Sequence, residues 1–216
     1  TCTSGFSLEQ VLRCFGIPKA RIAVIPNGID PVFLSRKAVG GGTGVLFFGR
    51  LTGNKGARLA LEAYLRLPAE VRREHPLLIV GEGPQEGILR KRVRESDAQE
   101  EVRFLGWLDG EALARMIAAC KAVLLPSQEE SFGNAILEAL IMGQRLVTTR
   151  VCAIPELVGD FASLAAPDDE EEMAGQLLRE LGRPRSQEEV DAQAEYFRER
   201  YSWGVTARRY LELSNP

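Results

Sequence analysis

The sequence predicts an α/β protein built on a doubly wound, Rossmann-like parallel sheet, followed by C-terminal helices. Three observations support this class: short apolar runs without polar alternation, segments of helical period between them, and glycines or Pro-Ser after most of the runs. Parallel strands that are covered by helices on both faces have this continuous apolar character. The chain has 216 residues, 45% of them hydrophobic, which suffices for one good core.

The individual elements follow in order along the chain. Apolar runs predict strands at 22–26, 44–49, 76–81, 102–106, 122–126, 145–149 and, more weakly, 161–166. Segments of helical period predict helices at 57–67, 85–95, 110–120 and 134–142. The sheet then covers about residues 17–182, and the linker 182–187 leads to two helices at about 187–198 and 203–214. We therefore divide the chain into a Rossmann-like domain, 1–182, and a helical extension, 183–216.

Composition excludes several classes of function. The net charge of −3 gives no basic field for nucleic acid. The four cysteines form no C-x-x-C pair, and Cys120 and Cys152 lie in apolar runs, so we expect both to be small core residues in a reducing cytosol. No apolar stretch reaches 18 residues and no signal peptide is present, which predicts a cytoplasmic protein. The chain begins without Met, so we expect it to be a fragment.

The segment 49–56 is a glycine-rich loop directly after a predicted strand. Gly49 allows the backbone to approach a ligand closely, Arg50 offers a planar fork of donors, and Lys55 offers a mobile charge. In open α/β sheets, ligands bind beyond the carboxyl ends of the strands. A diphosphate could be held here, although two solvated surface cations would produce the same sequence.

A second loop, after the strand 122–126, leads into a helix that starts near Gly133. Backbone N–H groups around Phe132, Gly133 and Asn134 would point at one spot, where the helix dipole favours an anion. Glu130 precedes this helix, and Glu138 lies inside it among apolar residues, where an acid needs a partner. The alternative makes Glu130 a solvated loop acid and Glu138 an exposed helix residue. We favour a functional role for both.

The run Gly81–Gly87 resembles a dinucleotide fingerprint, but its spacing is wrong. Glu86 occupies the position of the third glycine, and two glutamates would face a pyrophosphate. The sequence therefore predicts a tight turn here, with Pro84 in the first turn of a helix.

Taken together, the motifs resemble one known family. VIPNGID (24–30), FFGRLTGNKG (47–56), VGEGP (80–84), VRFLGWL (102–108), LPSQEESFGNAILEAL (125–140) and IPELVGD (154–160) stand in the order seen in retaining glycosyltransferase family 4. The resemblance covers about residues 22–181 and implies the donor-binding, carboxyl-terminal half of a two-domain GT-B fold. It implies a metal-independent, hexosyltransferase-type enzyme of glycan biosynthesis that uses a nucleotide-diphosphate sugar as substrate and no cofactor.

The resemblance also implies roles for individual residues. Arg50 and Lys55, after Gly49, would hold the diphosphate and stabilise the departing nucleotide; Glu138 would accept hydrogen bonds from the ribose. Glu130 would contact the sugar near the reacting carbon, which makes Glu130, Arg50 and Lys55 the catalytic candidates. Further donor contacts would come from Trp107 and Leu108 along the base, and from Ser131, Phe132, Gly133 and Asn134 at the sugar or phosphate.

Some features depart from the family pattern. Val151-Cys152-Ala153 replaces a loop that often carries glycines, which narrows the expected sugar pocket, and Ser131 stands where Gly is frequent. The acceptor-binding amino-terminal domain is absent from this chain, and an acceptor at a membrane surface would be reached through it. Two alternatives stay open: a sugar-nucleotide epimerase of the same architecture, and a non-enzymatic nucleotide-binding domain.

Overall fold

A six-stranded parallel sheet forms the centre of the protein, as the computed structural model shows for residues 1–38 and 42–214. The strands are β1 (Val45–Phe48), β2 (Leu77–Val80), β3 (Val102–Gly106), β4 (Ala122–Leu125), β5 (Leu146–Thr149) and β6 (Ser163–Ala165). Their order is β3-β2-β1-β4-β5-β6, which reverses between β1 and β4. The predicted doubly wound sheet is confirmed, and the reversal is the position where such sheets bind ligands.

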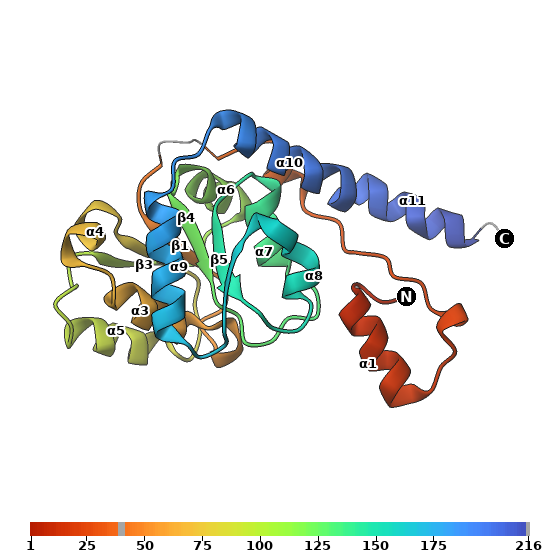
Figure 1. Cartoon of the computed structure of the whole chain (residues 1–216), viewed down its shortest axis with the longest axis horizontal. Coiled ribbons are helices and arrows are strands. Elements are labelled where there is room, and N and C mark those ends of the chain that lie inside the picture. The colour runs from red at the N-terminus through yellow and green to blue at the C-terminus, as the bar shows by residue number, and fades with distance from the viewer. Residues whose placement is uncertain (39–41, 215–216) are drawn as a thin grey trace.

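Helices cover both faces of this sheet (Figure 1). They are α3 (Ala57–Leu65), α4 (Ala69–Glu74), α5 (Glu86–Arg94), α6 (Gly110–Ala119), α7 (Asn134–Ile141), α8 (Ile154–Val158) and α9 (Glu170–Gly182). Helix α9 packs on α3, whereas α7 packs on α10 (Gln187–Tyr201). Asp169 caps α9 and three acids fill its first turn, as expected for acids near a helix N-terminus. Pro84 precedes α5 rather than lying in its first turn.

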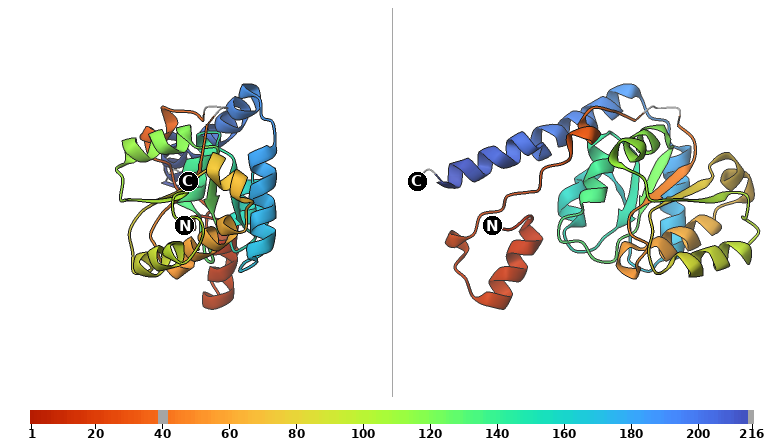
Figure 2. Two further views of the ribbon diagram at one scale, coloured as in Figure 1. Left: turned by 90° about the vertical axis from the view of Figure 1, so that its left-hand side faces the viewer. Right: turned by 180° about the vertical axis from the view of Figure 1, so that it is seen from behind.

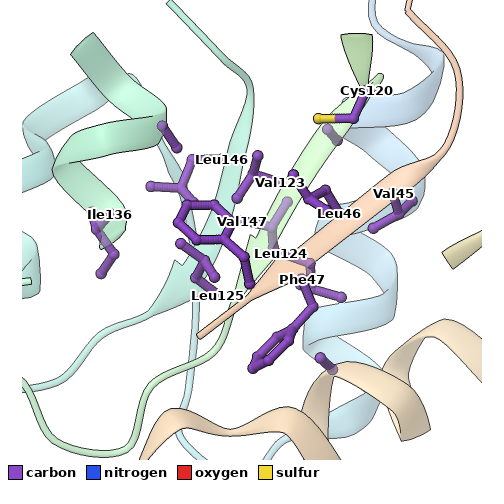
Figure 3. Close-up of a cluster of buried hydrophobic side chains, with 14 of the residues drawn as sticks. Val45, Leu46, Phe47, Cys120, Val123, Leu124, Leu125, Ile136, Leu146 and Val147 are labelled. Atoms are coloured by element: carbon purple, nitrogen blue, oxygen red, sulfur yellow. The ribbon is translucent and has the colours of Figure 1, made fainter. Parts of the chain in front are cut away.

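The core lies between the central strands and the helices on either side (Figure 3). Side chains from β1, β4 and β5 meet Ile136 of α7 and Cys120, and all of them are almost fully buried: Val45, Leu46, Phe47, Val123, Leu124, Leu125, Leu146 and Val147. Protein interiors of this kind are as densely packed as organic crystals. The ends of β1 and β4 therefore provide a firm base for the loops that follow them.

Two glycines let these loops pack backbone against backbone. Gly56 has a φ of +73°, and an added Cβ would lie 1.9 Å from the carbonyl oxygen of Pro126. Gly81 has a φ of +127°, and its Cβ would lie 1.9 Å from the carbonyl oxygen of Gly49. Because only glycine fits at both positions, the loops after β1, β2 and β4 form one connected surface.

The first 30 residues lie outside the sheet. Helix α1 (Gly5–Phe15) lies to one side of the sheet and belongs to neither of its helical layers (Figures 1 and 2). The strand expected at 22–26 is wrong: Val24 forms only an isolated bridge with Cys2. The reason is that this run pairs with Cys2, through Cys2 N to Ala23 O and Ile25 N to Cys2 O, and not with a strand of the sheet.

The C-terminal pair of helices is confirmed as α10 and α11 (Trp203–Ser214), with its break at Ser202. Residues 26–29 run along this break: the Ile29 N–H donates to the Tyr201 carbonyl at 2.9 Å. A Cβ on Gly28 would lie 2.8 Å from the backbone of Trp203, so the approach there is close. The side chain of Trp203 is 54% exposed, as expected for the outer face of this pair.

Candidate functional site

The carboxyl ends of β1, β2 and β3 open into a pocket of about 410 Å³, which we call the strand-end pocket. It is lined by Phe48, Gly49, Arg50, Val80, Gly81, Glu82, Trp107, Leu108, Leu113, Ala135 and Glu138. Three loops and the first turns of α7 thus contribute to it. Trp107 presents its indole at the rim with 70% exposure, a flat apolar surface next to charged groups. Pockets with apolar walls and a few polar groups are typical small-molecule sites.

Two side chains of opposite charge in the strand-end pocket have no partner among the described residues. The side chains of Arg50 and Glu138 make no hydrogen bond or ion pair with the residues that the structure describes. Burial raises the pKa of Glu138 to about 7, and the negative charge of Asp30 acts in the same direction. A carboxyl group desolvated in this way gains from a hydrogen-bond donor. The partner that the sequence analysis expected for Glu138 is thus not found among the described residues.

A second pocket, of about 540 Å³, lies between α1 and the loops after β1 and β4; we call it the α1 pocket. It is lined by Phe6, Gln10, Asn54, Lys55, Glu129, Glu130, Ser131 and Cys152. Here the charges are paired, because Lys55 Nζ donates to Glu130 Oε1 at 2.5 Å. Ser127 Oγ donates to the same oxygen at 3.1 Å. The Glu130 side chain is only 10% exposed, so this ion pair is partly shielded from solvent.

The start of α7 is arranged differently from the sequence expectation. Gly133 caps the helix with a φ of +98°, but Phe132, Gly133 and Asn134 line neither of the two pockets. Phe132 is buried, with its ring centroid 6.1 Å from that of Tyr201, and Asn134 Oδ1 accepts from Asn27 Nδ2 at 3.2 Å. These residues hold the helix in place, and their contact with a ligand stays a prediction.

Helix α1 is fastened to the sheet domain by polar contacts that the sequence did not reveal. The Glu156 carboxylate accepts from the N–H groups of Gly5 and Phe6, at 2.9 and 3.1 Å. Ser4 Oγ donates to the Ser131 carbonyl at 2.6 Å. An acid is favourable at a helix N-terminus, but only the fold brings residues so distant in sequence together. The α1 pocket consequently has a wall made by α1.

Cys152 is not a core residue, which corrects the expectation from its apolar neighbours. Its side chain is exposed and lines the α1 pocket, whereas Cys120 is buried as expected. The backbone of Cys152 has a φ of +50°, and this left-handed turn directs the side chain outward. The next residue, Ala153, donates its N–H to the carbonyl oxygen of Glu130 at 3.2 Å. The loop of Cys152 is thus tied to the loop of Glu130.

The part of the chain that the structure describes contains no cluster of three or more His, Cys, Asp or Glu suited to a metal ion. In the same residues, no helix is both long and apolar enough to span a membrane.

Comparison with known proteins gives consistent results. A family model described as glycosyl transferases group 1 matches residues 42–182. O-antigen chain mannosyltransferase B of Escherichia coli is 29% identical over 213 residues, which cover 93% of this chain and 56% of that protein. Glycogen synthase of Mycobacterium tuberculosis is 36% identical over 177 residues, which cover 78% of this chain and 42% of that protein. The chain thus spans about half the length of these curated relatives.

A solved structure supports the fold. HepE of Anabaena, crystallised in complex with UDP and glucose, superposes with a TM-score of 0.82 at 20% sequence identity. The superposition covers 100% of this chain and 62% of that protein. At this level of identity, the likeness concerns the fold alone.

Proposed function

Because the chain belongs to the glycosyl transferases group 1 family, we propose that it is the donor-binding half of a retaining, hexosyltransferase-type glycosyltransferase. In the reaction, the bond between the sugar's anomeric carbon and the terminal phosphate oxygen breaks, and its electrons stay with the nucleoside diphosphate. The oxygen of an acceptor hydroxyl bonds to that carbon, and the hydroxyl proton passes to the departing nucleoside diphosphate. The relatives named above are a transferase and a synthase, and neither favours the epimerase alternative.

The nucleotide occupies the strand-end pocket in this proposal. The observation that carries it is the pair of unpartnered charges, Arg50 and Glu138, beside the apolar surface of Trp107 and Leu108. A base lies along the apolar surface, and Glu138 accepts hydrogen bonds from the ribose hydroxyls. The guanidinium of Arg50 donates to the diphosphate, for which its forked geometry is well suited.

The sugar then extends into the α1 pocket. There Lys55 reaches the phosphate next to the sugar, and Glu130 lies near the reacting carbon. Two cations at the diphosphate stabilise the charge that develops on the leaving group. We therefore propose transfer without a metal ion or other cofactor. The HepE complex with UDP and glucose is a precedent in fold for a nucleotide and a sugar on this architecture.

Transfer itself needs an acceptor held in near-attack geometry. We propose that a second, amino-terminal domain supplies the acceptor contacts, since the matched relatives are about twice as long as the segment compared. The proposed setting is the cytoplasm, with an acceptor that can lie at a membrane surface. These features belong to the whole enzyme.

Calorimetric titration tests the nucleotide site. The chain should bind a nucleoside diphosphate more tightly than the matching monophosphate, because Arg50 and Lys55 act on the second phosphate. Arg50→Ala should weaken diphosphate binding about tenfold or more, since hydrogen bonds to charged groups contribute about 1.5–3 kcal/mol each. Uridine, guanosine and adenosine nucleotides are titrated in turn to identify the base.

Arg103→Ala is the matched control. Arg103 is an exposed arginine on β3, which β2 separates from β1, and it lines neither pocket. Its loss should change the dissociation constant less than about twofold, the range expected for an unrelated surface charge. Equal affinities of the unmutated chain for mono- and diphosphate, or equal losses in the two variants, would contradict the proposed diphosphate site.

A further inference from the structure

The Lys55 ammonium already has a carboxylate partner within the protein. Its ammonium donates to Glu130 at 2.5 Å, and the two side chains are 26% and 10% exposed. Ser127 Oγ adds a second hydrogen bond to the same carboxylate oxygen, which holds Glu130 in place. The backbone supports this arrangement, since Glu130 O accepts from the Ala153 N–H. Any anionic group that approaches Lys55 therefore meets a fixed negative charge beside it.

The two ligands of the proposed reaction differ in charge at this position. In a nucleotide sugar, each phosphate has one ester oxygen, one anhydride oxygen and one negative charge. Once the sugar has left, the terminal phosphate keeps only its anhydride link and has a second pKa of about 6, as a singly substituted phosphate does, so it carries close to two charges at neutral pH. The product thus brings an additional negative charge to the end of the diphosphate that faces Lys55.

We propose that Glu130 discriminates between these two ligands: it weakens the hold of Lys55 on the free nucleoside diphosphate and favours the nucleotide sugar. This inference rests on the proposed function. Like charges separated by a shared cation repel, and a partly buried pair is poorly screened by salt. The same carboxylate accepts hydrogen bonds from hydroxyls of a bound sugar. Glu130 therefore disfavours the product and favours the substrate, which assists product release.

The neighbouring Glu129 separates this role from a general effect of negative charge. Glu129 lines the same pocket, is exposed, and forms no ion pair with the residues described here. Exposed charges interact weakly with their surroundings because water and salt screen them. Only the acid that contacts Lys55 should change the preference between the two ligands.

The experiment compares dissociation constants for a nucleoside diphosphate and its nucleotide sugar, measured by calorimetry in the unmutated chain, Glu130→Gln and Glu129→Gln. In Glu130→Gln, diphosphate binding should tighten about three- to tenfold, in the range of a partly buried charge contact. Nucleotide-sugar binding should not tighten equally, so the affinity ratio shifts toward the diphosphate. Glu129→Gln should leave the ratio within about twofold. In the double variant Lys55→Ala with Glu130→Gln, this tightening of diphosphate binding should be absent.

Two outcomes would overturn the inference while leaving the proposed function intact. One is diphosphate binding in Glu130→Gln that is unchanged or weaker although the unmutated chain binds both ligands. The other is an equal shift in Glu129→Gln. If the unmutated chain binds neither ligand, that result would instead contradict the proposed function, and this inference with it. A circular dichroism spectrum and melting temperature confirm that each variant is folded before it is titrated.

Discussion

The strand-end pocket and the α1 pocket differ in how their charged side chains are paired. In the first, Arg50 and Glu138 point to the same space and have no partner among the described residues. In the second, Lys55 and Glu130 satisfy each other, and Ser127 completes the contact. Removing the Glu138 carboxylate from water without a partner costs stability, whereas the Lys55 ammonium offsets part of that cost for Glu130. A ligand that donates a hydrogen bond to Glu138 therefore adds a contact that the protein alone lacks. A ligand in the α1 pocket instead replaces part of the existing contact between Lys55 and Glu130.

This difference has a structural origin. Glu138 lies inside α7 with apolar neighbours on both sides, so no cation of its own helix can reach it. Glu130 lies on a loop that packs against the loop of Lys55, because Gly56 allows the close approach to Pro126. Variants in the strand-end pocket should thus change ligand affinity most, and variants in the α1 pocket should mainly change ligand preference.

The largest effect within this comparison is expected for Glu138→Ala. Its loss should weaken binding of a ribonucleoside diphosphate by about 1.5–3 kcal/mol, the contribution of hydrogen bonds to a charged group. Binding of the 2′,3′-dideoxy analogue should change much less, because that ligand has no hydroxyl for the carboxylate to accept from. The paired titrations use the same variant, so the analogue is its own control. If the variant loses the same affinity for both ligands, Glu138 has a structural role and does not contact the ribose hydroxyls.

A second effect, of similar size, should appear in the stability of the protein without ligand. Unfolded Glu has an ordinary pKa of 4.5, and burial raises the pKa of Glu138 to about 7 in the folded state. Between these values the folded protein keeps a proton that the unfolded chain has lost, so its stability falls as the pH rises. Above pH 7 both states are ionised, and the loss is complete. One pKa unit corresponds to about 1.4 kcal/mol, so the total cost is about 3 kcal/mol at most.

Glu138→Gln removes this dependence and serves as the test. Urea unfolding at several pH values should show the variant gaining stability over the unmutated chain from pH 4.5 to 7, with no further gain above. A difference that is constant with pH, or that shrinks as the pH rises, would show that Glu138 is not held in a desolvated environment.

The sheet was predictable from sequence because the strands are short apolar runs, most of them followed by a glycine or proline. Six of the seven expected strands are present, and 22–26 failed because it pairs with Cys2, and Pro26 O accepts from Thr206 of α11, rather than joining the sheet. Apolar character predicts burial, but it does not tell which partner covers the run. The same limit explains Cys152, whose left-handed backbone directs an otherwise core-like residue into a pocket.

Several residues that line the two pockets had been singled out in the sequence, but their arrangement was not predicted, and their roles stay predictions. Arg50 and Lys55 follow one strand, which suggested a single clamp, but they line different pockets. The ion pair between Lys55 and Glu130 depends on the packing of two loops far apart in sequence. Glu156 was missed for the same reason, since its partner α1 is brought to it only by the fold.

The central claim is that the nucleotide binds in the strand-end pocket, and tryptophan fluorescence tests it most directly. The chain has two tryptophans, Trp107 at the rim of that pocket and Trp203 on α11. With Trp203→Phe, a nucleoside diphosphate should produce a saturable change in the emission of Trp107. With Trp107→Phe, the same titration should produce none. A response that follows Trp203, or no response in either variant at concentrations where calorimetry detects binding, would contradict this placement.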